Sequence, residues 1–210
     1  MDIAKFLTGR RSRLVGLALL GVVLLGLGYA AGWLVPRLGM PDDSSAEAGF
    51  ARDMSEHHAQ AVEMGMIAFQ RATIPEVRTI GGDIALTQQG QIGTMQTWLK
   101  DWGLGPTGPN PPMAWMPDGE RALNGNLMPG MATREEIDKL RSATGKDVDI
   151  LFLQYMVRHH IGGIHMVNGI LDRTDDPQVR DLAQSMKRGQ TAEIATMTGL
   201  LNKLGAKPLQ

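Results

Sequence analysis

The sequence of 210 residues contains no cysteine and few aromatic residues, with 4 Phe, 4 Trp and 2 Tyr. The absence of cysteine excludes disulfides, zinc–thiolate sites and thiol catalysis. The formal net charge is −1, so no excess of basic residues points to nucleic acid. The Glu-x-x-His motif, which supplies ligands to the carboxylate-rich di-iron sites of many four-helix bundles, does not occur in the sequence. A di-iron site of this kind is therefore not expected. No phosphate-binding loop and no nucleophile paired with a base is present either, so enzyme classes that depend on them have no support.

Long apolar runs are also scarce, and the one exception is the uncharged stretch of 22 residues from Leu14 to Val35. About 20 apolar residues suffice to span a bilayer. Four basic residues precede the run, whereas only Arg37 follows it before two aspartates. This asymmetry predicts a cytoplasmic N-terminus over residues 1–13, a single transmembrane anchor over 14–35 and an extracytoplasmic C-terminal part. A cleaved signal peptide, which would leave a secreted protein, is the alternative.

Methionine is abundant, at 14 residues, and all five histidines lie in two short stretches. The first stretch, MSEHHAQAVEMG, begins at Met54, and the second, MVRHHIGGIHM, begins at Met156. When the sequence is shifted by 102 positions, it matches itself without a gap and the two His-His pairs coincide. The match continues well beyond the histidines, which predicts a duplicated unit over residues 50–103 and 152–205.

Each unit has the pattern of two helices joined by a short break that contains proline. Apolar residues recur at helical spacing on both sides of the break. We expect the first helices over residues 46–71 and 146–171, and each second helix to end near a glycine. In the second unit, Asp175 or Asp176 is expected to cap the helix that follows the break.

Two such hairpins predict an all-α, ferritin-like four-helix bundle with pseudo-symmetric halves over residues 46–205. A linker over residues 36–45 would join this domain to the anchor. The halves are connected by a long crossover, residues 104–145, which is rich in Gly, Pro and Met. Within it, Thr133 to Ser142 is expected to form a short helix, because TREE is a capping-box word.

The histidine pairs can be placed geometrically, because a helix turns about 100° per residue. Each stretch then presents its two adjacent histidines and flanking methionines on one broad helix face, and pseudo-symmetry would bring the two faces together inside the bundle. The candidate metal ligands are His57, His58, His159, His160, Met64, Met166, Met54 and Met156. The alternative for the methionines is core packing, which is favoured for Met54 and Met156. The alternative for the histidines is a hydrogen-bonded core.

A bound metal would satisfy several buried imidazoles at once, which otherwise cost free energy. Imidazole suits Zn, Cu, Fe and Ni, and thioether selects Cu(I), so His with Met and without Cys indicates copper, as Cu(I) or Cu(II). Zinc bound by four histidines stays open. His165 replaces Glu63 of the first unit and lies away from the other histidines, either exposed or in a separate surface site. In the crossover, methionines come as two close pairs, Met113 with Met116 and Met128 with Met131, and Trp115 lies between the first two. They either pin the loop to the bundle or form a thioether lid.

These features predict a membrane-anchored, extracytoplasmic protein that sequesters or hands over copper. Its partners would be the metal ion, the membrane and an unidentified protein that exchanges copper, but not nucleic acid. Two alternatives remain. One is a redox enzyme with His-bound copper. The other is a structural or interaction bundle without metal, its histidines forming a hydrogen-bonded core or a pH switch.

The stretches FARDMSEHHAQAVEMG, MPGMATREEIDKL and FLQYMVRHHIGGIHM resemble a ferritin-like family known as domain of unknown function 305. The resemblance covers about residues 46–205 and implies a four-helix fold in secreted or membrane-anchored bacterial proteins, some of which bind periplasmic copper and confer copper tolerance. It implies as ligands His57, His58, His159 and His160, with Met64 and Met166 nearby. It also aligns Asp149 with an acidic residue that could orient a histidine, and His165 stands where an acidic residue is expected.

Overall fold

The computed structural model describes residues 10–34 and 39–209, and the chain divides into two compact units, Met1–Met40 and Pro41–Gln210. The first unit contains helix α2, Arg10–Leu34. Within it, Arg13–Gly32 is long and apolar enough to cross a membrane. The residues of this stretch are apolar on every side of the helix, whereas a surface helix of a soluble domain carries one polar face.

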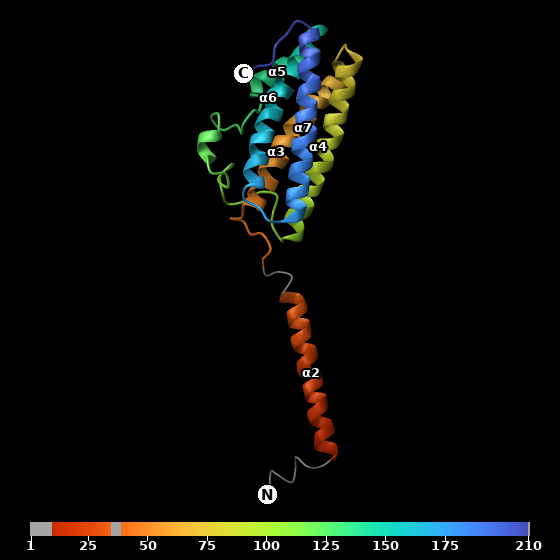
Figure 1. The fold of residues 1–210 in the computed structure, drawn as a ribbon, viewed down its shortest axis with the longest axis vertical. Coiled ribbons are helices and arrows are strands. Elements are labelled where there is room, and N and C mark those ends of the chain that lie inside the picture. The colour runs from red at the N-terminus through yellow and green to blue at the C-terminus, as the bar shows by residue number, and fades with distance from the viewer. Residues whose placement is uncertain (1–9, 35–38, 210) are drawn as a thin grey trace. The chain divides into compact units, whose positions relative to one another are not determined.

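The second unit is a bundle of four long helices (Figure 1). Helix α3, Ala46–Arg71, pairs with α4, Pro75–Asp101, and helix α6, Lys146–Leu171, pairs with α7, Pro177–Lys203. The two hairpins meet through α3 and α6, which lie antiparallel. No β-strand occurs in the described ranges, so the predicted all-α bundle of two hairpins is confirmed.

The helix ends follow the local sequence at most positions. Helix α5, Arg134–Ser142, opens with the expected capping box between Thr133 and Glu136. Of the two candidate caps of α7, Asp176 is the one used, and its carboxylate accepts hydrogen bonds from the backbone N–H groups of Gln178 and Val179. These side chains satisfy N–H groups that have no partner within the helix.

Helix α4 begins without a cap of its own, because the N-cap position is held by Ile74. The carboxylate of Asp149, fully buried on α6, instead binds the turn that precedes this helix. It accepts hydrogen bonds from the backbone N–H groups of Thr73, at 3.1 Å, and Ile74, at 3.0 Å. The prediction that Asp149 orients a histidine is therefore wrong, since this carboxylate fastens the α3–α4 turn to the start of α6.

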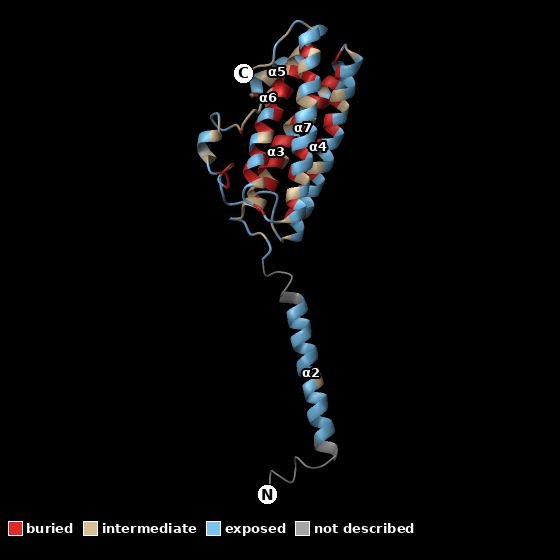
Figure 2. Ribbon diagram, in the orientation of Figure 1, coloured by how far each residue is buried: buried red, intermediate tan, exposed pale blue. Residues whose placement is uncertain are grey.

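The core consists of two apolar clusters, one at each end of the bundle. The first joins the start of α3 to the end of α6 and includes Phe50, Trp98 and Ile170, and the second joins their opposite ends and includes Phe152 and Leu201. Figure 2 shows that buried positions follow the inward faces of the helices, α3 and α6 above all. The middle of these two helices, between the clusters, carries the histidine pairs.

The crossover lies against the first cluster, as expected for a loop pinned by its Met and Trp side chains. Met113, Met116 and Met128 are buried there together with Trp115. The carboxylate of Asp53 on α3 accepts hydrogen bonds from the backbone N–H of Met113, at 2.7 Å, and from Trp115 Nε1, at 2.8 Å. A thioether lid would instead need side chains free to move, and these are held in the core.

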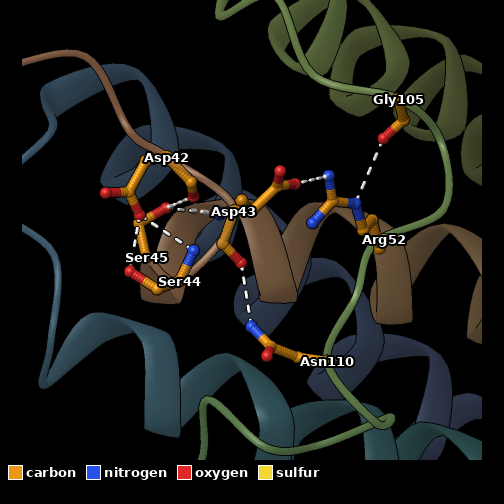
Figure 3. A network of polar contacts seen from close by, with 8 residues as sticks. Asp42, Asp43, Ser44, Ser45, Arg52, Gly105 and Asn110 are labelled. Atoms are coloured by element: carbon orange, nitrogen blue, oxygen red, sulfur yellow. Dashed lines mark hydrogen bonds and ion pairs between the residues drawn. The ribbon is translucent and has the colours of Figure 1, made fainter.

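A second polar network ties the start of the bundle to the crossover (Figure 3). The guanidinium group of Arg52 forms an ion pair with Asp43 and donates from Nε to the carbonyl of Gly105 at 3.1 Å. Asn110 Nδ2 donates to the carbonyl of Asp43 at 3.0 Å. Because this network joins residues about fifty to seventy positions apart, it fixes where the crossover begins its path over α3.

Candidate metal centre

The four paired histidines lie together in the interior of the bundle, and none is more than 1% exposed. His57 and His58 lie on α3, and His159 and His160 lie on α6. The rings of His57 and His159 are almost stacked, with centroids 3.8 Å apart and an interplanar angle of 32°. These two residues are equivalent in the repeat, so the pseudo-symmetry axis passes close to the point where they touch.

Three of the four imidazoles are oriented by a hydrogen bond from Nε2. His57 Nε2 donates to the carbonyl of Pro129 in the crossover, at 3.0 Å. His58 Nε2 donates to the side-chain oxygen of Gln91 on α4, at 2.7 Å. His160 Nε2 donates to the carboxylate of Glu193 on α7, at 2.6 Å. A proton on Nε2 leaves the lone pair on Nδ1 free in a neutral imidazole.

The opposite sides of these rings have no hydrogen-bond partner. The Nδ1 atoms of His57, His58 and His160 are buried and unpaired, and both ring nitrogens of His159 are unpaired as well. Buried polar atoms are almost always hydrogen-bonded, so a group of them marks a site for an ion or ligand, or a source of instability. The side-chain oxygens of Gln88 and Gln190, which are also equivalent in the repeat, are buried and unpaired too.

Burial favours the neutral form of three of these imidazoles, those of His57, His58 and His159. Removal from water, together with the neighbouring histidines, lowers the pKa of His57 to about 4 and that of His58 to about 3. The pKa of His159 is held well below the usual value of 6.5 by burial and by the proximity of His57. Since a metal ligand must be the neutral imidazole, these three histidines are in the form that binds metal across the physiological pH range.

The methionines predicted as ligands are all fully buried, but they are divided between the two apolar clusters. Met54 and Met166 belong to the first cluster, and Met64 and Met156 belong to the second. The thioethers thus lie on both sides of the histidine layer along the bundle axis. This placement agrees with packing and also supplies soft donors at both borders of the layer.

The donor set fits a soft or borderline metal ion, such as copper or zinc, better than a hard one. It consists of imidazoles with unpaired ring nitrogens, flanked by thioethers and amide oxygens, and the carboxylate of Glu193 is already engaged with His160. In residues 10–34 and 39–209, no three His, Asp or Glu side chains are gathered closely enough to hold one ion by themselves. The imidazoles therefore offer at most a pair of ligands at any one point, and further ligands would have to come from thioether or amide groups.

Several residues that shape the site lie outside the predicted ligand list. Pro129 supplies a carbonyl, and Gln91 and Glu193 supply side-chain acceptors that fix ring orientation. The repeat contained a signal for the last two, because Gln91 and Glu193 are separated by the same 102 positions as the histidines that they bind. Pro129 gave no such signal, because its role depends on how the crossover lies against α3.

Two glycines make the site possible. A Cβ atom on Gly162 would lie 1.9 Å from the carbonyl oxygen of Pro129, and one on Gly163 would lie 2.6 Å from the side-chain oxygen of Gln190. The first glycine therefore lets the crossover reach His57, and the second leaves room for a buried amide beside the histidines.

His165 stands apart from this site, because it is exposed and its Nε2 donates to the carboxylate of Asp118 at 2.7 Å.

The fold and the site define a class of protein: an antiparallel helical bundle of two repeated hairpins with paired histidines buried between them. The chain belongs to the DUF305 family, described as a domain of unknown function, whose family model matches residues 47–201. The predicted family is thereby confirmed. None of the curated proteins matches the sequence significantly.

Solved structures of this family are similar to the chain. A DUF305 protein from Streptomyces coelicolor is 44% identical, with a TM-score of 0.75, and the match covers 80% of this chain and 99% of that one. A DUF305 fragment from Deinococcus radiodurans is 33% identical, with a TM-score of 0.63, over 75% and 96% of the two chains. CopM in its Cu(II)-bound form is 27% identical, with a TM-score of 0.59, over 75% and 97% of the two chains.

Proposed function

We propose that this protein binds copper outside the cytoplasm through the histidine pairs of α3 and α6, and that its role is sequestration or handover. The observation that carries this proposal is the set of unpaired Nδ1 atoms on His57, His58, His159 and His160. Three of these rings are held by a hydrogen bond on Nε2, which is the arrangement that orients a metal-binding histidine. The ring nitrogens that remain are buried and without a protein partner.

In this proposal each residue has a defined part. No more than two of the four histidines bind any one copper ion, each through Nδ1, and His159 can use either ring nitrogen, because neither is engaged. Met54, Met166, Met64 and Met156 supply thioether donors at the borders of the histidine layer. Copper, when bound, contributes an acceptor for several lone pairs at once, and thioether donors favour its Cu(I) state. The buried layer, between two apolar clusters, keeps water from the ligands.

The relatives support copper as the metal, because CopM, a protein of the same fold that is 27% identical, has been solved with Cu(II) bound. The N-terminal helix supports a location at the membrane. In this proposal residues 1–13 are cytoplasmic, residues 14–35 anchor the chain and residues 46–205 form the exported domain. A cleaved signal peptide would leave the same domain in the extracytoplasmic space, so the copper site does not depend on the choice.

A metal-free structural bundle is the second candidate, and one observation favours it: no three His, Asp or Glu side chains in the described residues converge on one point. In that case the closely packed rings of His57 and His159 would be packing elements of the core. The two functions differ in what they require of His159. A ligand requires a ring nitrogen at this position, whereas a packing element requires only an apolar side chain of similar volume.

The test is a titration of the full-length chain in detergent with Cu(I), without oxygen and against a competing chelator. The informative variant is His159→Leu, which has a similar volume and breaks no hydrogen bond, because His159 makes none in this structure. We expect the variant to remain helical and to lose most of its affinity for Cu(I). The exposed His165→Ala variant is the matched control and should bind like the wild type. Absence of competition by the wild type would reject copper binding and favour the metal-free bundle.

A further inference from the structure

The two halves of the site are equivalent in sequence position but not in charge. His58 and His160 are related by the repeat, and so are the residues that accept their Nε2 protons, Gln91 and Glu193. The two hydrogen bonds are nearly the same length, 2.7 Å and 2.6 Å. Both imidazoles are fully buried, and both have an unpaired Nδ1. One imidazole is therefore supported by a neutral amide, and the other by a carboxylate.

This single difference changes how well each ring serves as a ligand. A carboxylate that accepts the second N–H of a histidine makes the ring a stronger donor, and such partners change metal affinity by about 10- to 100-fold. A negative charge close to the ion also attracts it, and the attraction grows in proportion to the charge of the ion. The Glu193 carboxylate is 29% exposed, so solvent weakens this attraction without removing it.

We infer that Glu193 makes the half of the site around His160 the preferred position for copper, and that it favours Cu(II) over Cu(I) there. Gln91 makes the half around His58 the weaker position and one with less preference between the two oxidation states. Glu193 is a positioning residue, because it acts through the His160 ring. The inference rests on the proposed function and deepens it, since it gives the two repeats different tasks within one site.

The test uses isosteric exchanges in the full-length chain in detergent. Glu193→Gln gives both halves an amide, Gln91→Glu gives both a carboxylate, and the double exchange moves the carboxylate to the other half. Affinities for Cu(II) and for Cu(I) are measured separately by chelator competition, and Cu(II) spectra are recorded by electron paramagnetic resonance. Circular dichroism of each variant reports whether the helices are intact.

We expect Glu193→Gln to weaken Cu(II) binding by about 10- to 100-fold and Cu(I) binding by a smaller factor, with a changed Cu(II) spectrum. The double exchange should restore tight Cu(II) binding, and Gln91→Glu should strengthen it. Equal losses for both oxidation states, without recovery in the double exchange, would overturn the inference and assign Glu193 a purely structural role. Unchanged binding in Glu193→Gln and Gln91→Glu would overturn it while leaving the proposed function intact. A wild type that binds neither ion would reject both.

Discussion

Gly162 offers a demanding test of how the crossover is held against the histidine site. In the interior of a helix, replacing Gly by Ala usually stabilises a protein by about 1 kcal/mol. At Gly162 the added Cβ would lie 1.9 Å from the carbonyl oxygen of Pro129 and 2.7 Å from the backbone nitrogen of Gly130. Both neighbours are backbone atoms, so no flexible side chain can move aside and the crossover itself must shift away from α6.

The size of the effect can be worked out from this geometry. Overpacking of a well-ordered contact costs about 1–3 kcal/mol. The shifted carbonyl of Pro129 is also the acceptor of His57 Nε2 at 3.0 Å, and a buried N–H that loses its partner costs about 1–3 kcal/mol more. After the usual gain from alanine is subtracted, Gly162→Ala should lower the free energy of unfolding by about 3 kcal/mol.

The assay is urea unfolding of residues 41–210, which form a compact unit with its own apolar clusters. The control is Gly90→Ala in α4, where an added Cβ would meet no atom within 4 Å. It should raise the free energy of unfolding by up to about 1 kcal/mol. A Gly162→Ala protein as stable as the wild type, or more stable, would refute the close contact between Pro129 and α6.

Three further outcomes follow from the same structure. Without metal, stability should fall as the pH drops from 6.5 towards 4, because the unfolded chain binds protons on His57, His58 and His159 in this range and the folded chain does not. The shift of His57 alone, from 6.5 to about 4, corresponds to about 3 kcal/mol, the other two add to it, and urea midpoints at each pH measure the sum. Asp149→Asn should destabilise the bundle by about 1–3 kcal/mol, because the turn before α4 loses its charged acceptor, and a fall in thermal midpoint checks this. Trp115→Phe leaves one oxygen of buried Asp53 with only the Met113 N–H, so the crossover should become the first segment cleaved in limited proteolysis.

The pH prediction has a definite sign that also tests the burial of the histidines. A histidine whose pKa is lowered on folding stabilises the protein fully above 6.5 and loses that contribution as the pH falls. A stability that stayed constant from pH 7 to pH 4 would mean that His57 is accessible to solvent.

The sequence alone determined the features of this protein that depend on local pattern and on the repeat. The absence of cysteine excluded disulfides, zinc–thiolate sites and thiol catalysis. One apolar run specified the N-terminal helix, and the internal match at an offset of 102 positions predicted two equivalent hairpins. The helices over residues 46–71 and 146–171, and the caps at Thr133 and Asp176, agree with the structure because periodicity and capping act within a few residues. Even the meeting of the two histidine faces follows from helical geometry once the repeat is recognised.

Only the tertiary structure decided which hydrogen-bond partner each buried polar group has, and which groups have none. The acceptors of the imidazole protons lie 33 residues away on α4 and α7, or 72 residues away in the crossover, and no local pattern fixes such partners. Because of how α6 packs against the α3–α4 hairpin, Asp149 contacts the turn before α4 and not a histidine. The same packing places two of the four methionines in each apolar cluster. Which ring nitrogen is engaged and which is left free depends on distances of a few tenths of an ångström between elements, and these arise only when the helices and the crossover pack together.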